Sequence, residues 1–207
     1  MKIATPERDE AIYAERRRDL ERLLGQPSVA DLRPCPGCDI PCPCRSSPSC
    51  TCGCSTSCAD APRQMSSEPE AHPIEPRIAP LVYSLYALRV CHPCWSCEGH
   101  YDARGELGRL PSVWFRTSTA AYPALIAECL WQLRYADKTA SSWRVAAVAL
   151  GDPLDATFSI EPDLRHAEAP ALSVLHRDVA AISTALVGEM RRIAKLALRE
   201  HHGAPRP

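Results

Sequence analysis

The sequence predicts an α+β fold, with a small mixed sheet, a long amphipathic C-terminal helix and a preceding arm rich in cysteine and proline. Three observations predict it. Short apolar runs between residues 79 and 162 have the length and spacing of strands around one helix. Residues 171–202 repeat apolar side chains in steps of three and four, as an amphipathic helix does. Twelve of the 20 prolines and eight of the 12 cysteines lie before residue 81.

These changes in composition divide the chain into five segments. They are an N-terminal helical segment at 1–30, a cysteine-rich tract at 31–62, a linker at 63–78, an α+β domain at 79–165, and the long C-terminal helix with its tail at 166–207. The first segment contains the pattern of a short helix that ends at Gly25. The tract has almost no large apolar side chain, so we expect disorder there unless metal holds it.

Within the α+β domain, residues 81–90 are apolar on both faces, which favours a strand covered on both sides. Residues 112–116 predict a second strand, 120–135 a helix and 143–150 a further strand. This order predicts a strand-helix-strand crossover. Residues 157–160 follow a turn rich in Gly and Pro and predict a strand that returns as a hairpin.

Residues 171–202 predict the longest element, a helix of roughly 48 Å at 1.5 Å per residue. Pro170 precedes it and Gly203 follows it, as expected at the two ends of a helix. Its apolar steps approximate the seam of a coiled coil. Two interpretations stay open, namely a homodimer formed through this helix and a helix packed on its own sheet. An unidentified protein partner is a further alternative.

The net charge is −1, from 24 basic and 25 acidic residues. This balance does not indicate nucleic acid as a partner, since nucleic-acid binding requires a basic surface. A local basic face stays open, although we interpret Arg16, Arg17 and Arg18 as a solvated helix face. No apolar run approaches the ~18 residues of a membrane helix. Residues 1–9 lack the apolar region of a secretory signal, so we expect a cytoplasmic protein.

Cytoplasmic thiols are kept reduced, so clustered cysteines there favour metal binding over structural disulfides. The first cluster consists of Cys35, Cys38, Cys42, Cys44, Cys50, Cys52, Cys54 and Cys58. Its C-x-x-C and C-x-C spacings suit zinc, which four thiolates complete as a tetrahedron. Eight thiols would form two such sites, or hold more ions if sulfurs are shared. In spacing and composition the tract is similar to metallothionein-type segments.

The second cluster places a ligand-type residue at every third position, at Cys91, Cys94, Cys97 and His100. Three thiolates and one imidazole are a recognised zinc set. His92 could replace Cys91 as a ligand or support the site from a second layer. We expect this segment to be a loop after the first strand. Because ten residues closing on one ion would be tight, a ligand from the first cluster could complete the site and tie the tract to the domain.

Two alternatives compete at the second cluster. An iron–sulfur cluster would make the chain an electron carrier, but the ferredoxin run needs a fourth cysteine where Tyr101 stands. Cys129 lies on the apolar side of the predicted helix 120–135, so we expect it in the core. A thiol oxidoreductase would use the C-x-x-C of Cys91 and Cys94. The glycines that follow argue against the helix that such a motif requires.

The sequence therefore predicts a cysteine-rich intracellular metal-binding protein that holds zinc or another soft metal in a structural or partner-binding role. The sequence contains neither a Gly-rich phosphate loop nor a G-x-S-x-G motif, so these motifs do not indicate an enzyme. Neither the substrate nor the partner follows from the residues alone.

Overall fold

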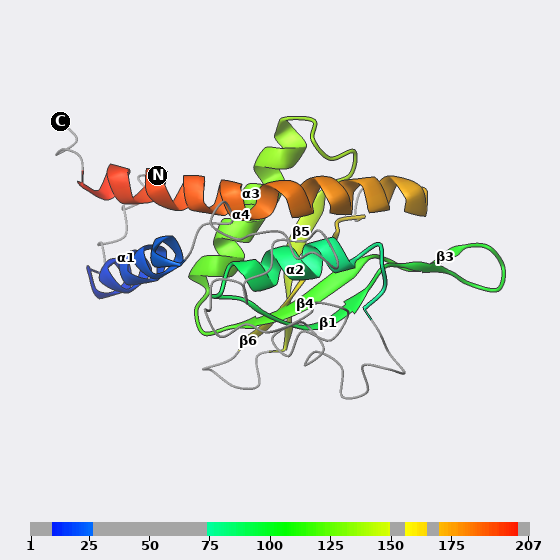
Figure 1. Ribbon diagram of the computed structural model, residues 1–207, viewed down its shortest axis with the longest axis horizontal. Helices are drawn as coiled ribbons and strands as arrows, with labels where there is room; N and C mark the ends of the chain where they lie inside the picture. The colour runs from blue at the N-terminus through cyan, green and yellow to red at the C-terminus, as the bar shows by residue number, and fades with distance from the viewer. Residues whose placement is uncertain (1–9, 27–73, 150–155, 165–169, 203–207) are drawn as a thin grey trace, which may run out of the picture.

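The computed structural model describes residues 10–26, 74–149, 156–164 and 170–202. Within these ranges the predicted α+β fold is confirmed, with a four-stranded sheet, a two-stranded sheet and a long C-terminal helix (Figure 1). The tract of eight cysteines between Cys35 and Cys58 lies outside the described residues.

The four-stranded sheet has the order β1-β4-β6-β5. Its strands are β1 (His92–Cys97), β4 (Ser112–Thr117), β5 (Trp143–Ala149) and β6 (Ala156–Pro162). Each neighbouring pair is antiparallel, so β4 and β5 run in the same direction with β6 between them. Helix α3 (Ala121–Tyr135) connects β4 to β5, so the predicted crossover is present with one strand inserted. The predicted hairpin of the last two strands is confirmed.

The first element of the domain differs from the prediction. The strand predicted at 81–90 is wrong, because α2 (Ala79–Ala87) is a helix there. Its residues are apolar on both faces because the helix is covered on several sides, with Leu81, Val82 and Leu85 fully buried. A short apolar run fits a buried helix as well as a buried strand. The segment predicted as a loop forms the strand β1 instead.

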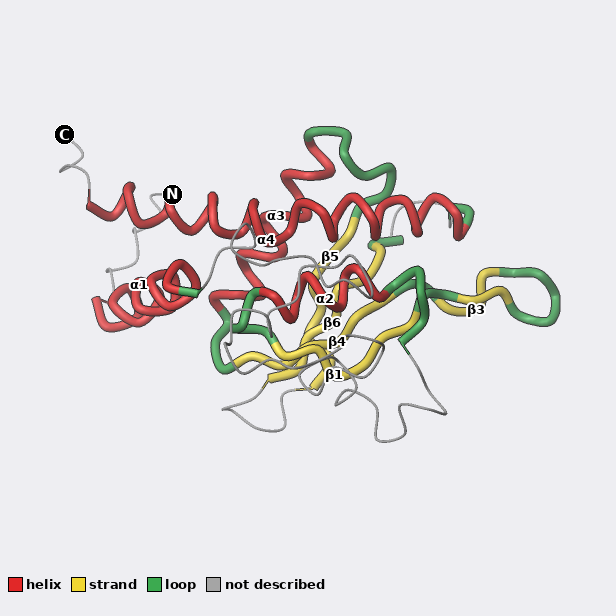
Figure 2. The backbone as a smooth tube through the Cα atoms, in the orientation of Figure 1, coloured by secondary structure: helices red, strands yellow, loops and turns green. Residues whose placement is uncertain are grey.

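The helices form layers on one face of the sheet, which we call the inner face (Figure 2). Helices α2 and α3 pack against the strands, and α4 (Leu172–His202) crosses over both helices. The inner face includes Val113, Phe115 and Ile160, each completely buried. The opposite, outer face includes Trp95 and Trp114, whose ring centroids are 4.8 Å apart.

Helix α4 buries most of its predicted apolar seam within its own chain. Leu175, Val179, Ile182 and Leu186 are almost completely buried, whereas Leu196 is 44% exposed. The interpretation of a helix packed on its own domain therefore accounts for most of the seam. The homodimer stays a prediction. In the described part of the chain, no helix has the length and apolar character needed to cross a membrane.

Helix α1 (Glu10–Gly25) packs on α3 and α4 at the left of Figure 1. Its buried Asp19 accepts a hydrogen bond of 2.7 Å from the Thr119 hydroxyl, just before α3. At its C-terminal end, the guanidinium of Arg191 donates to the carbonyls of Leu23, Leu24 and Gln26 at 3.0–3.2 Å. A cation at the C-terminal end of a helix satisfies the last carbonyls and the helix dipole.

The two-stranded sheet follows β1 directly. It pairs β2 (His100–Tyr101) with β3 (Leu107–Arg109), and Figure 1 shows this hairpin extending from the right-hand side of the molecule. Its Tyr101 hydroxyl accepts a hydrogen bond of 3.2 Å from the backbone of Leu172, the first residue of α4. The hairpin therefore fixes the start of α4 beside the turn between β1 and β2.

Candidate metal centre

An irregularity in β1 decides where the cysteines of the second cluster point. Pro93 pairs with Phe115 and Trp95 pairs with Trp114, so the register shifts at Cys94. Without this bulge, residues 91, 93, 95 and 97 would share one face of the sheet. With it, Cys91 joins the core beneath the helices, whereas Cys97 pairs with Ser112 on the outer face.

The turn after β1 brings His100 back beside Cys97. Gly99 has a φ of +90°, which L side chains rarely adopt. Its backbone N–H lies 3.4 Å from the Sγ atom of Cys97, as a donor to the sulfur. A Cβ atom at this position would lie 2.7 Å from Cδ1 of Leu172, so the turn packs tightly against α4. Only glycine fits this turn without strain.

The third member of the site comes from the segment before α2. Glu75 Oε2 accepts a hydrogen bond of 2.7 Å from the backbone N–H of Glu98. In return, Glu98 Oε2 accepts one of 2.9 Å from the backbone N–H of Arg77. The carbonyl of Glu98 lies 2.8 Å from Nε2 of His176 on α4. These contacts attach the segment before α2 to the β1–β2 turn.

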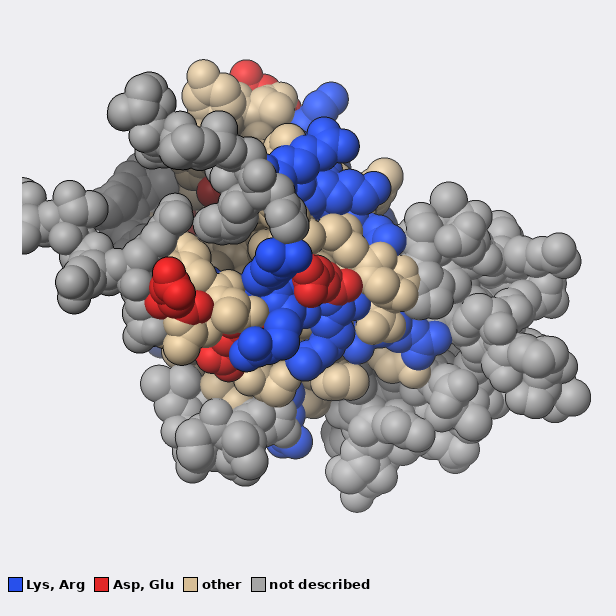
Figure 3. All heavy atoms as spheres, turned by 90° about the vertical axis from the view of Figure 1, so that its left-hand side faces the viewer, with Lys and Arg blue, Asp and Glu red and all other residues tan. Residues whose placement is uncertain are grey.

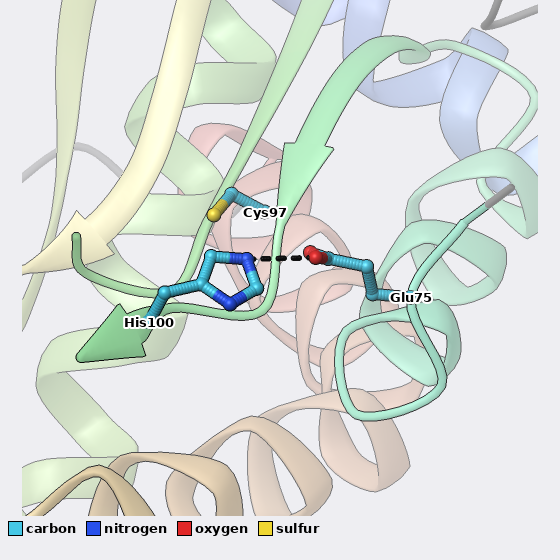
Figure 4. Close-up of side chains that lie close together, drawn as sticks. All are labelled: Glu75, Cys97 and His100. Carbon is cyan, nitrogen blue, oxygen red and sulfur yellow. Dashed lines mark ion pairs between the residues drawn. The ribbon is translucent and has the colours of Figure 1, made fainter. Parts of the chain in front are cut away.

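The described residues contain one group of metal-ligand side chains, formed by Glu75, Cys97 and His100, whose donor atoms all lie within 4.8 Å of one another. Figure 4 shows the three side chains converging from two separate segments. His100 Nε2 and Glu75 Oε1 are 2.7 Å apart. The Cys97 side chain is buried, whereas those of His100 and Glu75 are 48% and 32% exposed. The group therefore has a buried sulfur and two ligands open to solvent.

This donor set fits a zinc ion chemically. Zinc binds thiolate sulfur at about 2.3 Å and imidazole nitrogen or carboxylate oxygen at about 2.0–2.2 Å, so two ligand atoms of a tetrahedral site are about 3.3–3.7 Å apart. The donor atoms of the group lie within 4.8 Å of one another, so the side chains must shift slightly to take up this geometry around an ion. Three protein ligands leave one of the four tetrahedral positions for water or another donor.

Cys97 also borders a hollow of about 590 Å³ on the outer face of the sheet. Trp95, Trp114, Arg109 and Arg144 line the same hollow. One of the three ligands, Cys97, therefore lies at the wall of this hollow.

Burial raises the pKa of the Cys97 thiol, and the nearby carboxylates of Glu75 and Glu98 raise it further. The hydrogen bond from Gly99 and the charge of Arg109 act in the opposite direction. A metal ion binds the thiolate, so binding at this group would release a proton from Cys97.

The structure brings together two residues of the second cluster, Cys97 and His100. Cys91 and Cys94 lie outside the metal-ligand group, as does the exposed His92 at the start of β1. Sequence reasoning missed Glu75, because an acidic residue in a polar linker carries no signal of its partner. The available clue was that ten residues are a tight segment to supply every ligand of one ion, which indicates a ligand from a second segment.

Neither alternative for the second cluster gains support from this arrangement. Burial strongly raises the pKa of the Cys91 thiol, whereas a redox nucleophile requires a lowered pKa. The residues after Cys91 form a strand, not a helix that would stabilise a thiolate. Cys129 is completely buried in α3, which confirms its expected place in the core.

Comparisons of this chain with models of protein families, with curated proteins and with solved structures find no match.

Proposed function

We propose that the protein binds a zinc ion, or a similar soft or borderline divalent ion, through Glu75, Cys97 and His100. One observation carries this proposal, namely that three chemically suitable donors from two segments converge within 4.8 Å. Sulfur, nitrogen and oxygen ligands together suit zinc better than they suit calcium or magnesium, which prefer oxygen alone.

We propose a structural role for this ion. It would join the segment before α2 to the β1–β2 turn, reinforcing the hydrogen bonds between Glu75 and Glu98. A ligand that binds only the folded state stabilises it, by about 2.7 kcal/mol at a free concentration 100 times its Kd. The tract between Cys35 and Cys58 would bind further ions through its thiols, as its spacing predicts.

Metal titration of the full-length chain tests the proposal. A background with serine at all eight tract cysteines isolates the candidate centre. In this background we expect one zinc ion per chain and, with cobalt(II) as a probe, a thiolate-to-cobalt absorption band. Cys97→Ser should abolish the band. Loss of a residue that only supports a metal ligand weakens metal binding about 10- to 100-fold, so Glu75→Gln or His100→Asn should weaken zinc binding at least this much.

Cys94→Ser is the matched control, since Cys94 lies three residues from Cys97 but outside the metal-ligand group. It should retain the cobalt band and the zinc affinity. If Cys94→Ser and Cys97→Ser weaken binding equally, or if no ion binds in the serine background, the proposed centre is wrong.

A further inference from the structure

Basic side chains gather on the end of the molecule formed by α1 and the last turns of α4. Arg22 of α1 is exposed but pairs with the buried Asp19. Six further exposed cations lie on this end, namely Arg16, Arg17, Arg18, Arg192, Lys195 and Arg199. Figure 3 views the molecule from the left-hand side of Figure 1 and shows Lys and Arg in a band across this face, with few acidic residues among them. We call these six residues the basic surface.

Contacts with neighbouring helices orient the basic surface. Residues 192, 195 and 199 are spaced by three and four, so they form one stripe along α4. Arg191, beside this stripe, holds the C-terminal end of α1. On the other side, Arg192 donates to the amide oxygen of Gln132 on α3. The stripe therefore lies between α1 and α3.

Within the described part of the chain, four of these cations have no ion-pair partner. Arg17 pairs with Glu21, and Arg192 pairs with Glu189. Arg16, Arg18, Lys195 and Arg199 form no ion pair with any residue that the structure describes. These four cations on one face create a local positive potential, although the net charge of the chain is −1.

An exposed pair of aromatic rings lies next to this stripe. Trp131 and Tyr135 of α3 are 60% and 79% exposed. Their rings are stacked, with centroids 5.4 Å apart and planes at 15°. Gln132, which contacts Arg192, precedes Tyr135 by three residues and so neighbours it on the helix surface. Two exposed rings side by side form a contiguous apolar patch, and such patches, unlike scattered single residues, mark binding surfaces.

We infer that the basic surface and the Trp131–Tyr135 pair together bind single-stranded nucleic acid. Lysine and arginine contact phosphates, while exposed rings stack with unpaired bases. An acidic protein would use the cations but not the stacked rings. A duplex would not present its bases to the rings, because they are already stacked inside the helix.

Anisotropy of a labelled single-stranded oligonucleotide of about 15 nucleotides tests this inference on the full-length protein. Lys195→Glu with Arg199→Glu should weaken binding more than about tenfold and reduce the salt dependence by about 1.4 in the log–log slope. The control pair Arg104→Glu with Arg177→Glu makes the same change of charge at exposed positions outside the basic surface. It should change affinity less than about threefold.

The aromatic pair needs its own readout. Trp131→Ala should weaken binding between about fivefold and 150-fold, because each stacked base contributes about 1–3 kcal/mol. In the wild-type chain, which has four tryptophans, the oligonucleotide should quench part of the fluorescence, and Trp131→Phe should remove this quenching. Circular dichroism checks that each variant is folded. We expect each to fold, because the substituted residue is exposed.

Three results would overturn the inference. One is equal weakening by the two charge-reversal pairs. Another is unchanged affinity in Trp131→Ala, which would leave only an unspecific attraction of charges. The last is binding of polyglutamate or of anionic lipid vesicles as tight as that of the oligonucleotide, which would indicate a partner of another class.

Discussion

Gly99 turns the chain at the end of β1, and its backbone determines whether Cys97 and His100 can meet. Gly99→Ala should destabilise the protein by about 1–3 kcal/mol through backbone strain, with a further loss from the contact with Leu172 at 2.7 Å. Gly105→Ala is a matched control, because Gly105 also has a positive φ, but a Cβ atom added there would have no neighbour within 4 Å. Urea denaturation measures both. Equal losses would mean that packing against α4 contributes nothing.

At the scale of single residues, the sequence indicates some members of the candidate site and conceals others. Cys97 and His100 are visible from their spacing, and Gly99 from its place between them. Glu75 is not visible, because its contact with His100 depends on how the segment before α2 docks on the turn. The bulge at Cys94 is equally hidden, although it places Cys91 and Cys97 on opposite faces.

At the scale of elements, Arg191 makes α1 part of the domain. Arg191→Ala removes three hydrogen bonds, two to the carbonyls of Leu23 and Leu24 at the end of α1 and one to that of Gln26 just after it. Hydrogen bonds to a charged group contribute about 1.5–3 kcal/mol each at most, so we expect α1 to open locally without unfolding of the sheet. Hydrogen exchange of residues 10–26 should become faster, while exchange in β4 and β6 should not change.

Arg192→Ala is the control for this prediction, since its contacts are with Glu189 and with Gln132 of α3, and exposed ion pairs contribute little. It should leave exchange in α1 unchanged. Arg191→Lys should restore only part of the protection, because an ammonium group lacks the planar geometry of the guanidinium. Protection of α1 that survives in Arg191→Ala would show that Asp19 and the buried leucines suffice.

The elements themselves differ in how well periodicity identifies them. The amphipathic residues of α4 are identified correctly, because one face of this helix is buried and the other is not. Helix α2 lacks this contrast, as its apolar residues occur on all sides. Pro80 in its first turn was the better signal, since proline is favoured at the start of a helix. β1 was missed because Cys, His and Pro are not typical strand residues.

At the scale of the whole molecule, α4 connects the two surfaces for which we propose functions. Its first turns contact β2 through Leu172 and the β1–β2 turn through His176. Its last turns carry the stripe of Arg192, Lys195 and Arg199. A helix of 31 residues is about 46 Å long, so the two surfaces are well separated. Substitutions at distant sites without shared partners usually have additive effects.

Buried thiol and phenol groups should make the stability of the whole fold sensitive to high pH. Burial raises the pKa of Cys129 from 9.0 to about 12 and, with the charge of Asp19, that of Tyr122 from 10.0 to about 12. The pKa of Cys91 is also raised by burial. In the unfolded chain these groups lose their protons at lower pH than in the folded chain. Above about pH 9 the folded state therefore holds more protons, and stability falls as the pH rises.

We expect the free energy of unfolding to be insensitive to these groups below about pH 8 and to fall between about pH 9 and 12, by up to about 1.4 kcal/mol per pH unit for each group. Cys129→Ala removes one of these groups, so the free energy of unfolding of this variant should fall less steeply across this pH range. Loss of packing lowers its free energy of unfolding at neutral pH. Urea denaturation at a series of pH values measures both slopes. Parallel curves for the two proteins would show that Cys129 is not protected from ionisation in the folded state.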